Sequence, residues 1–428
     1  MKDFLVVGAG LYGAVMAREL TRKGYSCVVI DKRKASGGNI RTAMRHGIMV
    51  HEFGAHIFHT SDDEVWKYVT DFVPMVPFVH SPVACYKGSF YSLPFNMHTF
   101  RELFGIDDPA EAKARIEEEA RAEKDRLLSE RRMNISCPVT HGTKSGPEAQ
   151  KKKTRGQTEK EEFSILRQED IFTADNLEEQ AITTVGRTVY ETLIKGYTAK
   201  QWGRDPKELS VDIIKRIPVR YAFDNDYFSD KYEGLPDAAS GGYTGLIDRL
   251  LDGIEVRLCT DYLELRASRD PETWYTDPGL GLAKRVIYTG AIDEFFGECY
   301  GPLSYRSLRF EEEELDREDF QGHAVVNYTD AETPYTRIIE HKYLTAYAEK
   351  DFASEKYTVI TREYPKIFEP GDERYYPVRD RESMDKYEKY RELAAGCPGI
   401  AFGGRLGSYR YLDMDKVIKE ALNDSRTY

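Results

Sequence analysis

The feature that most restricts the fold of this chain lies in its first 31 residues. An apolar run is followed by a Gly-x-Gly-x-x-Gly spacing, and a second apolar run ends at Asp31. The positions are residues 4–7, Gly8, Gly10, Gly13 and residues 28–30. This order predicts a strand, a tight turn, a helix and a returning parallel strand, which together form a βαβ unit with a dinucleotide site.

Each residue of this motif has a separate physical role. Gly8 permits the turn, Gly10 lets the backbone approach a pyrophosphate, and Gly13 lets the helix pack closely on the strand. The phosphates then meet the positive end of the helix. Asp31 stands in the ~20-residue register of an acid that binds a ribose hydroxyl. A glycine-rich turn without a ligand is the alternative interpretation.

The residues after Asp31 indicate which nucleotide binds. Lys32 opens a basic segment, and a second glycine pair with Gly38 and Asn39 follows it. A basic, glycine-rich segment soon after the ribose acid is more typical of FAD folds than of simple NAD dehydrogenases. We therefore expect FAD.

Composition excludes several functional classes. The chain has 428 residues, 41% hydrophobic and 31% charged, which indicates a globular protein of two or three lobes. Its net charge of −12 argues against general nucleic-acid binding. No run reaches the ~18 apolar residues of a membrane span. The N-terminus enters the first strand directly, so we expect no signal peptide and a cytoplasmic location.

Cysteine and tyrosine usage give two further expectations. The six cysteines show no Cys-x-x-Cys pair or metal spacing, so we expect reduced thiols and no metal site. The 29 tyrosines suit a pocket whose aromatic faces also carry hydroxyl donors.

Two histidines, His56 and His59, follow a short predicted strand and a glycine-containing turn. No carboxylate or thiolate at ligand spacing completes a metal site with them. We expect them to line a pocket; two half-buried structural histidines are the alternative.

Between residues 83 and 162, the sequence predicts a hairpin, a long helix and a polar segment in turn. Residues 83–86 and 90–93 predict a hairpin across a turn at 87–89. Asp108 is the expected N-cap of a helix that runs to about Arg132. Residues 136–162 are polar and lack periodicity, which predicts a mobile insertion; a basic nucleic-acid patch around residues 151–153 is the alternative.

Aromatic and basic residues interleave between residues 195 and 228, as a nucleotide-sugar pocket requires. Residues 324–328, 337–339 and 358–360 predict an antiparallel sheet. Residues 400–402 predict a strand, after which Asp413 is expected to cap a helix that begins near Met414. The N-terminus of that helix is expected to point at the isoalloxazine ring.

Several blocks together resemble the bacterial type of the UDP-galactopyranose mutase family. They are residues 8–13, 37–39, 54–60, 195–202, 293–296 and 403–414. The resemblance implies interconversion of UDP-galactopyranose and UDP-galactofuranose with reduced FAD and no net redox change, which supplies galactofuranose for cell-surface glycans. It also implies that nitrogen-5 of the flavin attacks the anomeric carbon and forms a flavin-sugar adduct, from which an iminium species lets the sugar ring open and reclose.

The resemblance also assigns roles to individual residues. Arg216 and Arg337 match the arginines that hold the diphosphate, and with His56 and His59 they form the predicted catalytic set. The predicted substrate-binding residues are Arg216, Arg337, Tyr197, Thr198, Trp202, Tyr227, Asn327, Tyr376, Tyr411 and Asn96. The predicted cofactor-binding residues are Gly8, Gly10, Leu11, Gly13, Asp31, Lys32, Gly38, Asn39, His56, Ile57, Arg306, Arg405, Tyr411, Asp413 and Met414.

The expected fold class is α/β, with a Rossmann-like FAD-binding domain, a helical domain and an antiparallel sheet domain. The FAD domain is assigned to residues 1–80, 240–265 and 395–428. The helical domain is assigned to residues 100–215, with a polar insertion near 129–173. The sheet domain is assigned to residues 81–99, 216–239 and 300–394. The UDP-sugar is expected where the three meet, under the loop that carries Trp202.

The resemblance further implies a homodimer through the helical domain and a cellular reductant for FAD. Leu193 departs from the phenylalanine that many members carry near uracil. Three alternatives remain open: an FAD amine-oxidase-like oxidoreductase, a mutase acting on UDP-N-acetylgalactosamine, and a non-catalytic flavin or nucleotide-sugar binding protein.

Overall fold

The computed structural model describes residues 1–135, 172–214, 219–269, 277–349, 354 and 356–428, which form two compact units. The first unit comprises Met1–Pro94, Lys200–Gly203 and Asn225–Tyr428. The second unit comprises Phe95–Ala199 and Arg204–Asp224. The predicted insertion at residues 136–162 and the predicted substrate residue Arg216 lie outside the described residues.

A parallel five-stranded sheet organises the first unit. Its strand order is β10 (Glu255–Arg257), β2 (Cys27–Ile30), β1 (Lys2–Val7), β11 (Ala283–Tyr288) and β17 (Ile400–Phe402). Helix α1 (Leu11–Arg22) connects β1 to β2, which pair in parallel. The predicted βαβ unit is therefore confirmed, and strands from distant parts of the sequence complete its sheet.

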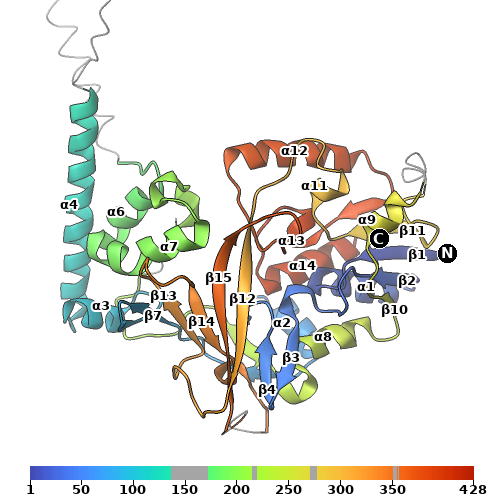
Figure 1. The fold of residues 1–428 in the computed structure, drawn as a ribbon, viewed down its shortest axis with the longest axis horizontal. Coiled ribbons are helices and arrows are strands. Elements are labelled where there is room, and N and C mark those ends of the chain that lie inside the picture. Colours follow the sequence, from blue (N-terminus) through green and yellow to red (C-terminus); the bar gives the residue numbers. More distant parts are fainter. Residues whose placement is uncertain (136–171, 215–218, 270–276, 350–353, 355) are drawn as a thin grey trace, which may run out of the picture. The chain divides into compact units, whose positions relative to one another are not determined.

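The centre of this sheet is buried on both faces, which explains why β2 and residues 4–6 of β1 are apolar, whereas Glu255 and Arg257 on the edge strand β10 are exposed. On one face, alternate residues such as Phe4 and Val6 pack with α1, α8 (Gly242–Leu251) and α14 (Met414–Ser425). The opposite face, with Leu5 and Val28, packs with α9 (Tyr262–Ala267) and α11 (Ile292–Phe295). Figure 1 shows α1 and α14 beside the parallel strands.

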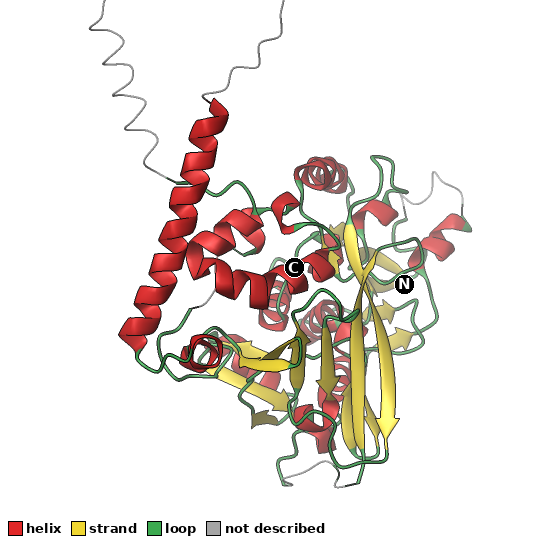
Figure 2. Ribbon diagram, turned by 60° about the vertical axis from the view of Figure 1, so that its left-hand side comes forward, coloured by secondary structure: helices red, strands yellow, loops and turns green. Residues whose placement is uncertain are grey.

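A seven-stranded sheet forms the other main part of the first unit. Its order is β16 (Tyr376–Pro377), β12 (Tyr305–Leu315), β15 (Thr358–Ile367), β14 (Arg337–Glu340), β13 (Val325–Tyr328), β7 (Val83–Tyr86) and β8 (Ser89–Ser92). Figure 2 shows the long strands β12 and β15 side by side. The predicted antiparallel sheet is confirmed, with one parallel pair, β13 and β7, that the sequence patterns did not predict.

The β7–β8 hairpin is tighter than predicted. Ser89 already pairs with Tyr86, so the turn consists of Lys87 and Gly88 alone. Both residues have positive φ, 51° and 85°, which matches the two-residue turns favoured in hairpins.

Smaller elements complete the first unit. β3 (Thr42–Arg45) pairs with β4 (Ile48–His51), and β9 (Tyr232–Pro236) pairs with both β5 (Phe58–Thr60) and β6 (Met75–Pro77). The further helical elements are α2 (Asp63–Thr70), α12 (Arg381–Ala395), α13 (Gly404–Gly407), η1 (Gly38–Ile40), η5 (Ala238–Ser240) and η6 (His341–Leu344).

The second unit is helical. Its elements are α3 (Met97–Phe104), α4 (Pro109–Ile135), α6 (Leu177–Val189), the π-helix η2 (Tyr190–Ile194), α7 (Lys195–Trp202), η3 (Pro206–Glu208) and η4 (Val211–Ile213); the last three residues of α7 belong to the first unit. Asp108 Oδ1 accepts a hydrogen bond from the Glu111 N–H, which confirms the predicted N-cap of α4. The helix continues past the predicted end at Arg132, and i,i+4 pairs such as Arg126 and Glu130 support its last turns.

Candidate functional site

The glycine turn after β1 leaves no room for side chains at two positions. Gly8 has φ of 109°, and a Cβ on Gly13 would lie 2.0 Å from the carbonyl oxygen of Gly8. Gly10 occupies the N-cap of α1 without a capping side chain, so the first-turn N–H groups of Leu11 and its neighbours are available to an anion.

Asp31 and the second glycine pair close around this turn. The carboxylate of Asp31 is buried; Oδ2 accepts from the Ala9 N–H at 2.7 Å, and Oδ1 accepts from the Arg33 N–H at 2.8 Å. A Cβ on Gly38 would lie 3.0 Å from the Cα of Gly10, so the two glycine segments approach backbone to backbone. Lys32 is exposed.

Arg33 and Arg405, both in the first unit, have buried nitrogen atoms without a hydrogen-bond partner among the described residues. Arg33 Nη2 donates to Asn39 Oδ1 at 2.9 Å and to Glu373 Oε2 at 2.6 Å. Within the described part of the chain, Arg33 Nη1 and Arg405 Nε are buried without a hydrogen-bond partner. A buried donor without an acceptor is costly, and an anionic ligand would satisfy it. The residues present therefore fit a diphosphate-containing cofactor.

The C-terminal helix α14 begins at Met414, as predicted. Asp413 occupies its N-cap position, but its side chain makes no capping hydrogen bond. Asp413 therefore stands at the predicted N-cap position of a helix that begins where it was predicted, without a capping hydrogen bond from its side chain. Thr60, at the end of β5, donates to Asp415 Oδ2 at 3.2 Å, which ties the histidine segment to this helix.

The His56 ring has a defined protonation state. Its Nδ1 lies 2.7 Å from the Gly54 carbonyl, so Nδ1 carries the proton and Nε2 is the acceptor. Burial lowers the pKa of His56 to about 4, which keeps the ring neutral at pH 7. The His56 N–H donates to Nδ1 of the buried His51, a residue that the sequence patterns did not single out. Ile57, next in the chain, is buried in an apolar cluster.

His59 lies in a stack of three rings. Its ring lies 3.8 Å from that of Phe228 at 13°, and the His80 ring lies 5.8 Å from the same Phe228 ring at 27°. His59 Nδ1 lies 2.8 Å from Asp230 Oδ2. Tyr227, predicted to bind substrate, packs edge-on against His80 at 5.5 Å and is 42% exposed.

Asn327, Arg337 and Glu363 form one row across the seven-stranded sheet. Asn327 pairs with Arg337 between β13 and β14, and Arg337 pairs with Glu363 between β14 and β15. Arg337 Nε lies 3.5 Å from Glu363 Oε1, whose side chain is 2% exposed. Directly opposed residues share a face, so the three side chains lie on the same side of the sheet. The sequence patterns did not single out Glu363.

Tyr376, Tyr411 and Arg405 form a second group on the first unit. The two tyrosine rings lie 5.6 Å apart, and the Arg405 guanidinium lies over the Tyr411 ring at 4.3 Å. Burial raises the pKa of Tyr411 and lowers that of His80 to about 3, while the positive charge of Arg337 lowers the pKa of both groups. The structure therefore brings Tyr376, Tyr411 and Arg405 together.

The segment Lys200–Gly203, which carries Trp202, is held by two cations. Lys200 Nζ donates to the carbonyl oxygens of Tyr328, Thr333 and Tyr335 at 2.8, 3.0 and 3.1 Å. Arg306 is buried, and its Nε donates to the Gln201 carbonyl at 2.9 Å. Arg306, predicted to contact the cofactor, thus contacts the end of α7, and Lys200 was missed because nothing in its sequence neighbourhood identifies its partners.

The other predicted substrate residues lie in the second unit. Tyr197 is half-buried and Thr198 is buried, both in α7. Asn96 is the buried N-cap of α3: its Oδ1 accepts from the His98 N–H, and its Nδ2 donates to the Asp224 carbonyl. Asn96 thus caps α3, and its role in substrate binding stays a prediction.

The described residues contain neither a metal-ligand cluster nor a helix suited to crossing a membrane. Among them, no cluster of three or more His, Cys, Asp or Glu side chains could hold a metal ion. No helix in the described ranges combines the length and the apolar character that a membrane crossing requires.

The parallel sheet, the glycine turn and the acid at the end of β2 define a protein with a Rossmann-like dinucleotide-binding domain. A family model for such NAD(P)-binding domains matches residues 6–72. A second model, for UDP-galactopyranose mutase, matches residues 192–411. A relative from Klebsiella pneumoniae, named as a probable UDP-galactopyranose mutase, is 37% identical over 98% of this chain and 93% of its own length. This chain belongs to the UDP-galactopyranose mutase family, and it is an enzyme of the isomerase type.

Two further proteins, one compared by sequence and one by structure, are similar to this chain over nearly its whole length. A dTDP-fucopyranose mutase from Escherichia coli is 33% identical over 100% of this chain and 98% of its own length. The crystal structure of a reduced UDP-galactopyranose mutase matches with a TM-score of 0.64, 13% identity, and coverage of 99% of this chain and 93% of that one. At this identity, the structural match shows the common fold.

Proposed function

We propose that this enzyme interconverts UDP-galactopyranose and UDP-galactofuranose with FAD as its cofactor and no net redox change. Family membership supports the reaction. The observation that carries the proposal is the row of Asn327, Arg337 and Glu363, because it presents a fixed guanidinium beside a polar amide on one face of the sheet. A guanidinium stays charged and can bind a diphosphate through two parallel hydrogen bonds.

The cofactor would be held by the residues around the glycine turn. The first turn of α1 and Gly10 would receive the pyrophosphate, Asp31 the ribose, and Arg33 and Arg405 the remaining anionic or carbonyl oxygens. When bound in its reduced form, FAD supplies the nucleophile for the anomeric carbon of the sugar.

The residues of the seven-stranded sheet would act on the leaving group. Negative charge develops on the diphosphate as the bond to the sugar breaks, and Arg337 stabilises that charge. The hydroxyl groups of Tyr227, Tyr376 and Tyr411 add donors to the same oxygens. His56 is neutral at pH 7, so it orients ligand donors through Nε2 without adding a competing charge.

Further features of the proposal rest on the family resemblance. Arg216 would be the second diphosphate arginine, Asn327 would lie near the sugar, and Tyr197, Thr198 and Trp202 would bind the uridine half. We also propose a homodimer, a cellular reductant for FAD, and the division into FAD-binding, helical and sheet domains given above.

The test is anaerobic incubation of the purified protein with UDP-galactofuranose, once with dithionite-reduced flavin and once with oxidised flavin, followed by chromatography of the sugar nucleotides. We expect UDP-galactopyranose only with reduced flavin, and none with Arg337→Ala. Arg362→Ala is the matched control, because Arg362 is adjacent to Glu363 on β15 and therefore points to the opposite face, where it pairs with Glu313 at 2.8 Å.

The relative named dTDP-fucopyranose mutase favours a second candidate substrate. The same assay should therefore include dTDP-fucofuranose and UDP-N-acetylgalactosamine. If the enzyme converts dTDP-fucofuranose faster than UDP-galactofuranose, dTDP-fucofuranose is the preferred substrate. Oxygen consumption with an amine, without isomerisation of any sugar nucleotide, would favour the oxidoreductase reading, whereas binding without turnover would favour a binding protein.

A further inference from the structure

The helix that leads to Tyr197 and Thr198 contains a break. Within α6, Gly186 has φ of 80° and ψ of 165°, so the chain leaves the helical conformation at this residue and resumes it at once. A Cβ on Gly186 would lie 2.7 Å from the Cβ of Glu119 on α4. The positive φ and the close approach both restrict this position to glycine.

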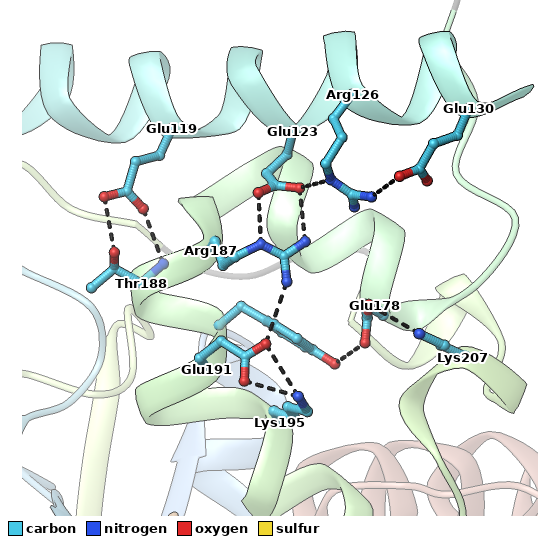
Figure 3. A network of polar contacts seen from close by, with 11 residues as sticks. Glu119, Glu123, Arg126, Glu130, Glu178, Arg187, Thr188, Glu191, Lys195 and Lys207 are labelled. Carbon is cyan, nitrogen blue, oxygen red and sulfur yellow. Dashed lines mark hydrogen bonds and ion pairs between the residues drawn. The ribbon is translucent and has the colours of Figure 1, made fainter. Parts of the chain in front are cut away.

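Glu119 supplies the cap that the resumed helix needs. The first N–H groups of a helix have no partner within the helix itself. Glu119 Oε2 accepts from the Thr188 N–H at 3.0 Å, and Oε1 accepts from the Thr188 hydroxyl at 2.9 Å. The Glu119 side chain is 14% exposed. A carboxylate from a different helix therefore caps the start of the segment, as Figure 3 shows.

Glu123, one turn further along α4, holds the next residue of the segment. Its two oxygens accept from Nε and Nη2 of Arg187 at 2.6 and 2.8 Å. The Arg187 guanidinium lowers the pKa of Glu123 to about 2, so the pair is fully charged at neutral pH. The Glu123 side chain is 12% exposed and that of Arg187 38%, and the two parallel hydrogen bonds distinguish this pair from single-contact surface ion pairs.

From Arg187 the contacts continue along the helix toward the predicted substrate residues. Arg187 Nη1 donates to Glu191 at 3.3 Å, and Glu191 accepts from Lys195 at 2.9 and 3.1 Å. The intervening residues form the π-helix η2, in which the fully buried Tyr190 donates to Glu178 at 2.7 Å. Figure 3 shows this line of contacts from α4 to Lys195, two residues before Tyr197.

We propose that Glu119 and Glu123 are positioning residues for substrate binding, because they fix the start and the rotation of the helix that presents Tyr197 and Thr198. The inference rests on the proposed function, in which these two residues bind the uridine half. A shift of the chain by one residue along an α-helix rotates each side chain by about 100° about the helix axis. Because the helix is broken at Gly186, the direction in which the side chains of residues 187–199 point depends on the contacts that Glu119 and Glu123 make with Thr188 and Arg187. A π-helix is frequent at functional sites and supplies the extra residue in this segment.

The test compares Glu119→Ala, Glu119→Gln and Glu123→Ala with the control Glu130→Gln. Glu130 lies on the same helix and is 49% exposed, but its partner Arg126 also binds Glu123, so Glu117→Gln is a second control: Glu117 pairs with Lys113 at 3.8 Å and is 62% exposed. Each variant is assayed for kcat and KM under reducing anaerobic conditions, and UDP affinity is measured by the change in tryptophan fluorescence. Hydrogen–deuterium exchange of peptides spanning residues 188–199 measures how firmly the segment is held.

We expect KM and the dissociation constant for UDP to rise about tenfold in Glu119→Ala and Glu123→Ala, the equivalent of one hydrogen bond to a charged group. The turnover number should stay within about twofold at saturating substrate, since uniform binding alone is lost. Exchange over residues 188–199 should accelerate in the same variants. Glu119→Gln keeps an acceptor for the Thr188 N–H and should recover most of the affinity.

Faster exchange with wild-type KM in the alanine variants would overturn the inference, since the anchors would then be purely structural. A lower turnover number with unchanged KM would overturn it as well. If Glu119→Ala does not fold, Thr188→Val carries the test: it removes only the hydroxyl contact, and an unchanged KM would contradict the proposal. Wild-type protein that binds and converts no sugar nucleotide would instead refute the proposed function.

Discussion

Arg337 on β14 lies directly opposite Asn327 on β13, and both side chains share one face of the seven-stranded sheet. Glu363 lies opposite Arg337 on β15, the other strand next to β14. Its nearly inaccessible carboxylate lies 3.5 Å from the Arg337 Nε. The guanidinium therefore has its charged partner on the neighbouring strand β15, and its orientation does not depend on a surface loop. Such preorganisation is what stabilisation of a developing charge requires.

Replacing Arg337 by lysine should separate charge from geometry. Arg337→Lys keeps the positive charge but loses the planar fork that binds two oxygens at once. We expect kcat/KM to fall by about 10²-fold, measured in the anaerobic mutase assay. Arg362→Lys, on the opposite face of the same sheet, should leave kcat/KM unchanged. An equal loss of kcat/KM in both variants would show that a general disturbance of the sheet, and not the guanidinium geometry of Arg337, causes the effect.

Two glycines of the turn should respond differently to alanine. A Cβ on Gly10 meets its nearest neighbour, the Gly38 Cα, at 3.8 Å, which is ordinary contact, and Gly10 has φ of −81°. Gly10→Ala should therefore fold normally but lose FAD, because the methyl group occupies the space of the phosphate. Gly13→Ala should lower the melting temperature of the protein even without FAD, since its Cβ would meet the Gly8 carbonyl oxygen at 2.0 Å.

Differential scanning fluorimetry of the flavin-free proteins, together with flavin absorbance after reconstitution, checks both outcomes. Retention of FAD by a folded Gly10→Ala variant would place the pyrophosphate elsewhere.

Lys200 should be important for stability as well as for the position of Trp202. Its ammonium donates to the carbonyl oxygens of Tyr328, Thr333 and Tyr335, and Lys200→Met leaves all three without that donor. We expect the free energy of unfolding to fall by about 2 kcal/mol, measured by urea denaturation. Lys67→Met is the control, because Lys67 is 75% exposed and pairs only within its helix. A loss of similar size in Lys67→Met would contradict this explanation.

Glu233 should make stability depend on pH. Burial, with the nearby charges of Asp226 and Asp230, raises the pKa of Glu233 from 4.5 to about 7. Between these values the folded state holds a proton that the unfolded state has lost. The free energy of unfolding should therefore fall as pH rises from about 4.5 to about 7. Glu233→Gln should remove this part of the pH dependence in urea titrations at pH 5 and pH 8; an unchanged slope would assign the effect to another group.

Local patterns predicted the elements that depend on neighbouring residues. The strand–turn–helix–strand order around Gly8 and Asp31, the N-cap at Asp108 and the start of α14 at Met414 all follow from short-range rules, and the structure confirms them. The hairpin turn was predicted one residue too long, because register is set by pairing that the residues at the turn do not specify alone.

Contacts between distant parts of the chain could not be predicted in this way. Nothing near Lys200 indicates that its three acceptors lie more than a hundred residues away, between β13 and β14. Asp413 stands at the N-cap of α14, yet its side chain makes no capping hydrogen bond, which its sequence position alone does not indicate.

The sequence by itself determined the βαβ unit, its glycine turn and the family resemblance, because periodicity, glycine spacing and motif identity are local properties of a chain. Only the tertiary structure decided that Glu363 pairs with Arg337, that Lys200 holds a loop of the seven-stranded sheet, and that Glu119 caps a helix broken at Gly186. These pairings arise from strand register and helix packing, whose free energy depends on residues far apart in sequence.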